Sequence, residues 1–207
     1  MQKCYRVAVD KAQIGRPRAF DAEAALEKAV GVFVEHGYEG ASLTALTEGM
    51  GISRKSMYAA FGNKEELYRK ALQRYTEGRG SYICEALEAP TAHEVATLFL
   101  TGAVEANTQP GCPSGCLGVQ GALAVGETGQ AAREASSEWR TRGQEHLRKR
   151  FQRAVDDGDL PSEADPTLIA RYLVTISNGM AVQATGGASR EDLQRVADAA
   201  LRNWPPR

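Results

Sequence analysis

The sequence lacks the long apolar run of a membrane-spanning helix, because stretches such as residues 29–34 fall far short of about 20 residues. Lys3 and Arg6 stand near the start, but no hydrophobic segment of a secretion signal follows them. With four cysteines in 207 residues and no such signal, a disulfide framework is not expected. The alternating pattern of β-strands is also missing. We therefore predict an all-α, cytoplasmic protein with reduced thiols and no membrane partner.

Charge of one sign is lacking as well. The formal net charge is −1 at pH 7, which neither favours nor excludes a nucleic-acid partner. Residues 1–70 carry a slight excess of Lys and Arg, so the positions of single cations matter more than totals. The histidines, at positions 36, 93 and 146, lie in different predicted helices without ligand spacing. We predict no metal site, no cofactor and no catalytic residue.

Apolar residues recur at helical spacing in about nine segments. The first helix is expected over residues 21–36, between an Asp21 N-cap and Gly37. Two short helices follow the caps Ser42 and Ser53, and a capping box at Asn63 opens a fourth that continues towards residue 87. The remaining five are expected to start near Thr91, Cys116, Gly129, Asp165 and Ser189.

These segments predict a three-part organisation. Residues 1–14 show no periodicity, which indicates a flexible N-terminal arm. Residues 15–62 contain two short helices joined by a glycine turn after a longer one, the outline of a helix-turn-helix domain. Residues 63–207 form a larger helical C-terminal domain.

Two cations follow directly on the cap of the third predicted helix. Arg54 and Lys55 come after Ser53, where the partial positive charge of a helix N-terminus makes each cation unfavourable by about 0.3–1 kcal/mol. Composition alone favours an ordinary solvated surface. Their position instead favours an external anion, and DNA phosphates or guanine edges meet that need.

Other polar side chains are expected near the same surface. Thr44 begins the second helix and Lys64 the fourth, where both can reach a phosphate. Arg16 and Arg18 belong to a segment that can enter the adjacent minor groove. Ser56 and Tyr58 add polar tips. Two alternatives to phosphate contact remain: Tyr58 can be half-buried packing support, and Lys64 can pair with a nearby Glu on its own helix.

These residues resemble a known family. Ser42-Leu-Thr-Ala-Leu, Gly51-Ile-Ser and Met57-Tyr58-Ala-Ala-Phe61-Gly-Asn-Lys64-Glu-Glu-Leu67 are similar to the DNA-binding region of the tetracycline-repressor (TetR) family. The resemblance spans residues 15–70, and its Tyr-x-x-Phe-x-x-Lys-x-x-Leu spacing is specific. Thr47 and Met50 depart from it, because the family usually has alanine at both positions.

The resemblance implies a repressor released from a palindromic operator by a small-molecule effector. It implies that Thr44, Tyr58 and Lys64 hold phosphates of double-stranded operator DNA. It also implies that Arg54, Lys55, Ser56 and Ala59 face the bases, and that residues 33, 46, 52 and 61 are core.

In the C-terminal domain the resemblance implies an effector cavity and a homodimer interface formed by the last two helices. The candidate effector-binding residues are Phe99, Cys116, Gln120, Trp139 and Tyr172. The candidate dimer residues are Ile169, Leu173, Ile176, Met180, Leu193, Val196 and Ala200. Apolar faces of this kind are equally typical of a subunit's own core.

Two other classes of function compete with this interpretation. Cys112 and Cys116 flank a Pro-containing loop, so a thiol-based redox sensor or a cysteine-dependent enzyme is the first alternative. No Cys-x-x-Cys pair or neighbouring histidine accompanies these thiols, which favours a packing role for Cys116. A helical adaptor that binds only proteins is the second alternative, and it leaves Arg54 and Lys55 unexplained.

Overall fold

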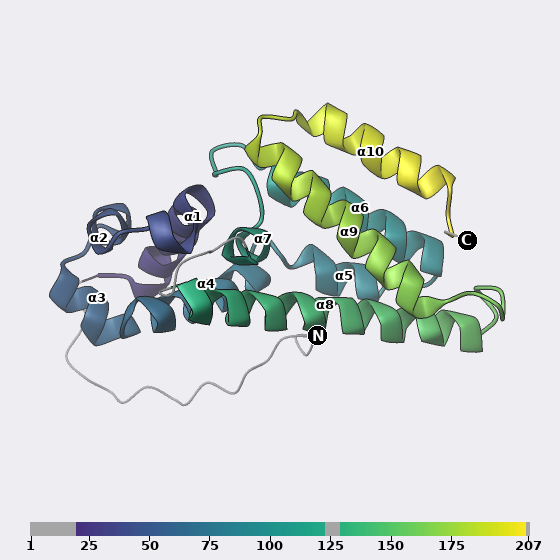
Figure 1. Cartoon of the computed structure of the whole chain (residues 1–207), viewed down its shortest axis with the longest axis horizontal. Coiled ribbons are helices and arrows are strands. Elements are labelled where there is room, and N and C mark those ends of the chain that lie inside the picture. Colours follow the sequence, from purple (N-terminus) through teal and green to yellow (C-terminus); the bar gives the residue numbers. More distant parts are fainter. Residues whose placement is uncertain (1–19, 123–128, 206–207) are drawn as a thin grey trace.

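A computed structural model describes residues 20–122 and 129–205, and within these ranges it consists of helices joined by turns (Figure 1). The helices are α1 (Ala22–Gly40), α2 (Leu43–Met50), α3 (Arg54–Phe61), α4 (Lys64–Glu77), α5 (Tyr82–Leu87), α6 (Ala92–Asn107), α7 (Leu117–Ala122), α8 (Gln130–Asp156), α9 (Pro166–Thr185) and α10 (Arg190–Arg202). The all-α prediction is confirmed.

The main difference from the sequence prediction lies after residue 63. One continuous helix was expected there, but α4 ends at Glu77 and α5 begins at Tyr82. Gly78 and Gly80 fall between them, and two glycines so close together lower the helix propensity of the segment. This break gives ten helices in the described residues instead of about nine, and it makes α4 a separate element.

Most helix ends follow the predicted signals. The Asp21 side chain accepts hydrogen bonds from the backbone N–H groups of Glu23 and Ala24. The side chains of Ser42 and Ser53 cap α2 and α3 in the same way. Gly37 breaks α1 with a φ of 66°, a conformation that favours glycine. The starts of α1, α2 and α3 are therefore specified by local signals.

The helices form two groups along the long axis of the molecule (Figure 1). In the first, α1 packs against α2 and α4, with α3 at the outer end. In the second, α8 and α9 pack against each other and against α6, and α10 covers α6 and α9. The α4 helix contacts α1 in one group and α8 in the other. It is therefore one link between them, and α7, which contacts α1 and α8, is another.

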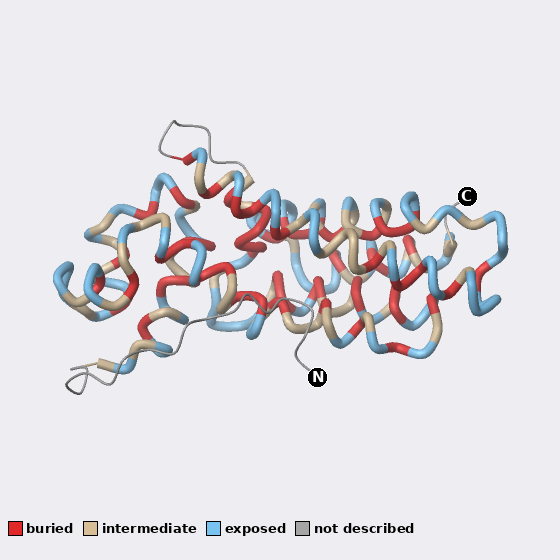
Figure 2. Tube along the Cα trace, turned by 90° about the horizontal axis from the view of Figure 1, so that it is seen from below, coloured by how far each residue is buried: buried red, intermediate tan, exposed pale blue. Residues whose placement is uncertain are grey.

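Buried residues lie along the inward faces of both groups (Figure 2). Phe33 and Leu46 are buried in the first group, and Phe151 and Leu173 in the second. No helix of the described residues is long and apolar enough to cross a bilayer.

Candidate nucleic-acid interface

The interface begins at the N-terminal turns of α2 and α3, which lie close together. Arg54 Nη2 donates a hydrogen bond of 3.0 Å to Thr44 Oγ1, so the first residue of α3 contacts the first turn of α2. Neither helix has an acidic residue in its first turn, whereas α4, α6 and α10 each do. Two helix N-termini and a guanidinium thus share one surface, and neither first turn contributes a carboxylate to it.

The α3 helix buries one face and exposes the other. Met57 and Phe61 are buried, while Arg54, Lys55 and Ala59 are exposed. Tyr58 is 47% exposed, which is unusual for a large aromatic side chain that serves only as packing support. Ser56 is half-buried, and its backbone N–H donates to the Ser53 cap at 3.1 Å. The exposed face has the polar and cationic character that base and phosphate contacts require.

Lys64, at the start of α4, is held in place by an aromatic ring. Its Nζ lies 4.5 Å from the centroid of the Tyr38 ring, within the range of a cation–π contact. The pKa of Lys64 is lowered, chiefly because partial burial disfavours the charged ammonium. Sequence reasoning did not identify Tyr38 as a partner, because it lies beyond the Gly37 break.

A buried polar contact joins α4 to the C-terminal group. The Tyr68 hydroxyl lies 2.8 Å from Ser136 Oγ on α8 and donates to the Leu117 carbonyl of α7 at 3.3 Å. Burial is the main reason why the pKa of Tyr68 is raised to about 12. The Tyr68 ring also meets Phe33 and Tyr38 of α1 edge-on, at centroid distances of 5.1 and 5.2 Å. Tyr68 therefore contacts both helix groups.

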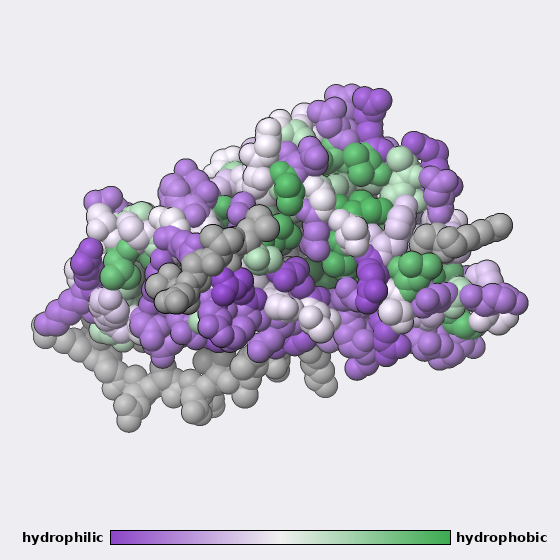
Figure 3. All heavy atoms as spheres, in the orientation of Figure 1, coloured by the Kyte–Doolittle hydropathy of each residue, from purple (hydrophilic) through white to green (hydrophobic). Residues whose placement is uncertain are grey.

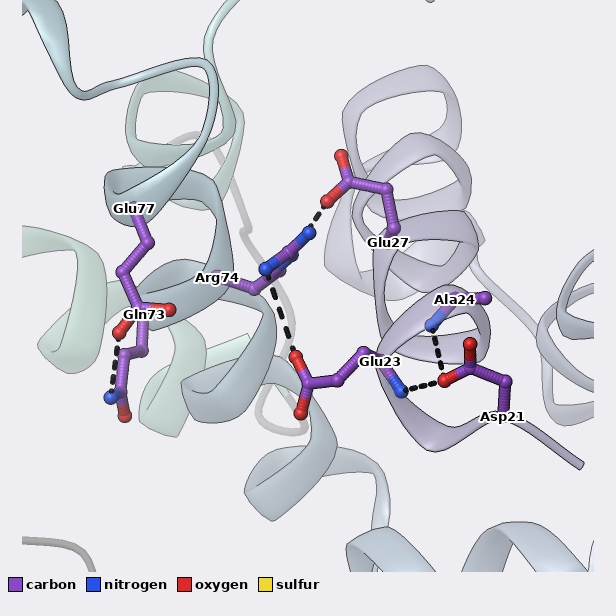
Figure 4. A network of polar contacts seen from close by, with 7 residues as sticks. All are labelled: Asp21, Glu23, Ala24, Glu27, Gln73, Arg74 and Glu77. Carbon is purple, nitrogen blue, oxygen red and sulfur yellow. Dashed lines mark hydrogen bonds and ion pairs between the residues drawn. The ribbon is translucent and has the colours of Figure 1, made fainter.

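An ion-pair network joins α4 to α1 on the solvent side (Figure 4). Arg74 Nε lies 2.7 Å from Glu27 Oε2, and Arg74 Nη1 lies 3.7 Å from Glu23 Oε2. The hydrogen bond with Glu27 is the leading cause of the raised pKa of Arg74. All three side chains are at least one-third exposed, so the network contributes modestly to stability.

A small cavity lies in the C-terminal group between α5, α6, α8 and α9. Its wall includes Phe99, Cys116 and Trp139 from the predicted effector set, but not Gln120 or Tyr172. The residues that sequence reasoning missed are Tyr82, Ile83, Arg140, Gly143, Gln144, Val174, Ser177 and Asn178. The space open to water is about 30 Å³, comparable to the volume of one water molecule in the liquid.

The predicted dimer residues are mostly part of the subunit's own core. Those buried within the single chain are Ile169, Leu173, Met180, Leu193 and Ala200. Ile176 is half-buried and Val196 is 48% exposed. Apolar periodicity identified the buried stripe of α9 and α10, and this stripe faces inward. Arg16 and Arg18 lie outside the described residues.

Known proteins share both parts of this architecture. Residues 25–71 match the family of bacterial regulatory proteins called the tetR family, and residues 96–200 match the tetracyclin repressor-like C-terminal domain. The HTH-type transcriptional repressor ComR of Escherichia coli K12 is 36% identical over 201 residues, which cover 92% of each chain. The HTH-type regulator YezE of Bacillus subtilis is 32% identical over 91% of this chain and 98% of its own.

The solved structures agree with the sequence matches. A cysteine mutant of the TetR family regulator CifR, complexed with 26-bp double-strand operator DNA, superimposes with a TM-score of 0.86 and 43% identity. The match covers 92% of this chain and 100% of that one. A TetR regulator from Rhodococcus sp. RHA1 gives a TM-score of 0.59 at 37% identity over 89% of this chain and 100% of its own. This chain therefore belongs to the TetR family and is a DNA-binding transcriptional regulator.

Proposed function

We propose that this protein is a homodimeric repressor that holds a near-palindromic operator and releases it when a small molecule occupies the C-terminal cavity. The observation that carries the proposal is the exposed Arg54–Lys55 pair at the N-terminus of α3, in a first turn without acidic residues. A polyanion offsets the unfavourable placement of both cations. ComR, a repressor by name, supports repression as the direction of control.

In the proposed complex α3 enters the major groove. Arg54, Lys55, Ser56 and Ala59 face the base edges, while Thr44, Tyr58 and Lys64 contact phosphates. The Arg54–Thr44 hydrogen bond pre-orients the guanidinium, and DNA must compete with that bond or extend it. Arg16 and Arg18 remain candidates for minor-groove contacts. A role at the chromosome places the protein in the cytoplasm.

The dimer is proposed to form through the outward faces of α9 and α10. Leu168 is 44% exposed, Val182 49% and Val196 48%, and the exposed Thr175 and Gly179 lie between the first two on α9. Apolar side chains gather over this part of the molecule in Figure 3. Such a surface suits a self-complementary helix pair. The interface residues are thus neighbours of the stripe that the sequence suggested.

The effector is proposed to occupy the cavity lined by Phe99, Cys116 and Trp139. Its wall is aromatic and apolar, with amide and hydroxyl groups from Gln144, Asn178 and Ser177 as orienting partners. Because the open space is so small, an organic effector must displace part of the wall and thereby select a different conformation.

The thiol alternative has weaker structural support. Cys112 is exposed and Cys116 is buried, and both are free thiols. Among the described residues no group of three or more His, Cys, Asp or Glu side chains is placed to bind a metal.

The test is a selection of duplexes from a random pool, followed by footprinting. We expect a near-palindrome whose half-sites lie about one helical turn, roughly 34–36 Å, apart or a multiple of it. Inserting half a turn between the half-sites should weaken binding at least 100-fold, because two rigidly linked α3 helices then face different sides of the duplex. Equal binding before and after the insertion would contradict the dimer. Failure to select any duplex would contradict the whole proposal.

A further inference from the structure

The cavity and the DNA-linked helix α4 do not touch directly. Among the described residues, those that line the cavity come from α5, α6, α8 and α9 and from Cys116 ahead of α7, and none comes from α4. Occupancy can therefore reach α4 through a lining side chain that contacts it, and Cys116, which is hydrogen-bonded to Tyr75 of α4, is one such residue. Trp139 is such a side chain, because its Nε1 donates a 2.8 Å hydrogen bond to Thr76 Oγ1 on α4.

The Trp139–Thr76 hydrogen bond is buried and well defined. Trp139 is 8% exposed and Thr76 is 5% exposed, so water does not readily replace either partner. The Thr76 hydroxyl donates to the Leu72 carbonyl at 2.8 Å. Because its hydrogen is used there, the Thr76 oxygen is left to accept the hydrogen bond from the indole. The neighbouring Tyr75 ring meets the indole edge-on at 6.1 Å. Movement of the indole is thus felt at two consecutive residues of α4.

The indole also separates two spaces. On one side is the cavity of about 30 Å³, and on the other is a surface groove of about 390 Å³ between α4 and α8. Trp139 lines both, and Thr76 lines the groove. On a third side the indole packs closely against Gly118 of α7, because a Cβ at Gly118 would overlap the ring. The groove is therefore the direction in which a filled cavity can push the indole.

We propose that Trp139 is the positioning residue that transmits cavity occupancy to α4, and that the intact Trp139–Thr76 hydrogen bond is the contact through which a displaced indole moves α4. The inference rests on the proposed function and specifies how its cavity acts. Tyr68, nearer the start of α4, contacts Ser136 on α8 through its hydroxyl, and Ser136 lies three residues before Trp139. A shift of α8 relative to α4 at Trp139 is therefore passed towards Tyr38 and Lys64.

The test replaces the unidentified effector with a side chain. Ser177 lines the cavity from α9, and Ser177→Leu places a larger apolar side chain at the cavity wall, so it imitates occupancy. We expect Ser177→Leu to weaken binding of the full-length protein to the selected duplex about tenfold, in the range typical of allosteric coupling. Thr76→Val keeps the shape of residue 76 and removes the acceptor, and it should retain wild-type affinity within about threefold.

The double variant tests whether the Trp139–Thr76 hydrogen bond is needed for the effect of Ser177→Leu. In the Thr76→Val background, Ser177→Leu should change affinity less than about twofold, because the contact that transmits the strain is already gone. In the Thr76→Ser background, which keeps the hydroxyl, the tenfold effect should return. Trp139→Phe, which keeps a ring but lacks the donor, should behave like Thr76→Val and serves if that variant fails to fold.

Equal effects of Ser177→Leu in all backgrounds would overturn the role of Trp139, because the enlargement would then act by another route such as the dimer interface. The proposed function would survive that result. Its own failure is seen separately, as absence of wild-type binding to any duplex.

Discussion

The two ends of this molecule carry function in opposite ways. At the α2–α3 end, cations stand exposed beside helix N-termini, where they lower local stability until an anion arrives. At the cavity end, the working groups are buried and neutral, and they hold α4 by hydrogen bonds such as Trp139–Thr76. A surface made for a partner thus violates the rules of helix stability locally, whereas a transmitting core satisfies them.

The largest expected effect comes from reversing one charge at the exposed end. Arg54→Glu should weaken operator binding at least 100-fold, because it replaces a cation with an anion facing the duplex. The midpoint of thermal unfolding should stay within a few degrees, since Arg54 is exposed. Arg153→Glu, an exposed position near the end of α8, is the control and should leave affinity nearly unchanged. A parallel loss in the control would show a general charge effect.

A methyl group added at the buried end should lower the stability of the fold, whereas the charge reversal at the exposed end lowers DNA affinity. A Cβ on Gly121 of α7 would overlap Ser136 Oγ and the Tyr68 hydroxyl, so Gly121→Ala should lower the free energy of unfolding by about 1–3 kcal/mol. Gly31→Ala is the matched control, because nothing lies within 4 Å of its added Cβ. It should be neutral or stabilising by up to about 1 kcal/mol. Denaturant unfolding of both variants measures the contrast, and equal stability would contradict the close α4–α7–α8 packing.

The smallest effect is expected at the solvent-side link between the two ends. Arg74→Gln removes the ion pairs to Glu27 and Glu23, and exposed pairs of this kind contribute about 0.2–1 kcal/mol. The raised pKa of Arg74 keeps it charged over the whole working range, so the loss should not depend on pH between 6 and 9. High salt should shrink it by screening. A loss that persists undiminished in 1 M salt would indicate packing, not charge.

The sequence was most informative where signals are local. The caps at Asp21, Ser42 and Ser53 and the break at Gly37 were predictable because each depends on residues within one turn. The sequence prediction extends one helix across the division between α4 and α5, because apolar residues recur on both sides, although residues 76–81 contain no apolar side chain and include Gly78 and Gly80.

The cavity and the dimer surface were harder to predict. The sequence identifies Trp139 and Phe99 but not Ser177 and Asn178, because it does not show which face of α9 borders the cavity. Helical periodicity finds the buried stripe and cannot say whether the covering helix belongs to the same chain. For that reason the outward face at Leu168 and Val182 emerged only from the folded structure.

The central claim is that Arg54 and Lys55 stand at the start of α3 because DNA neutralises them. The most direct test compares the wild-type protein with the Arg54→Ala/Lys55→Ala variant. The affinity of each for the selected duplex is measured between about 50 and 200 mM salt, a range in which phosphate contacts weaken strongly. We expect tight wild-type binding that falls steeply with salt, and a variant that binds much more weakly with a shallower dependence. Equal affinities and slopes for the two proteins would contradict the account.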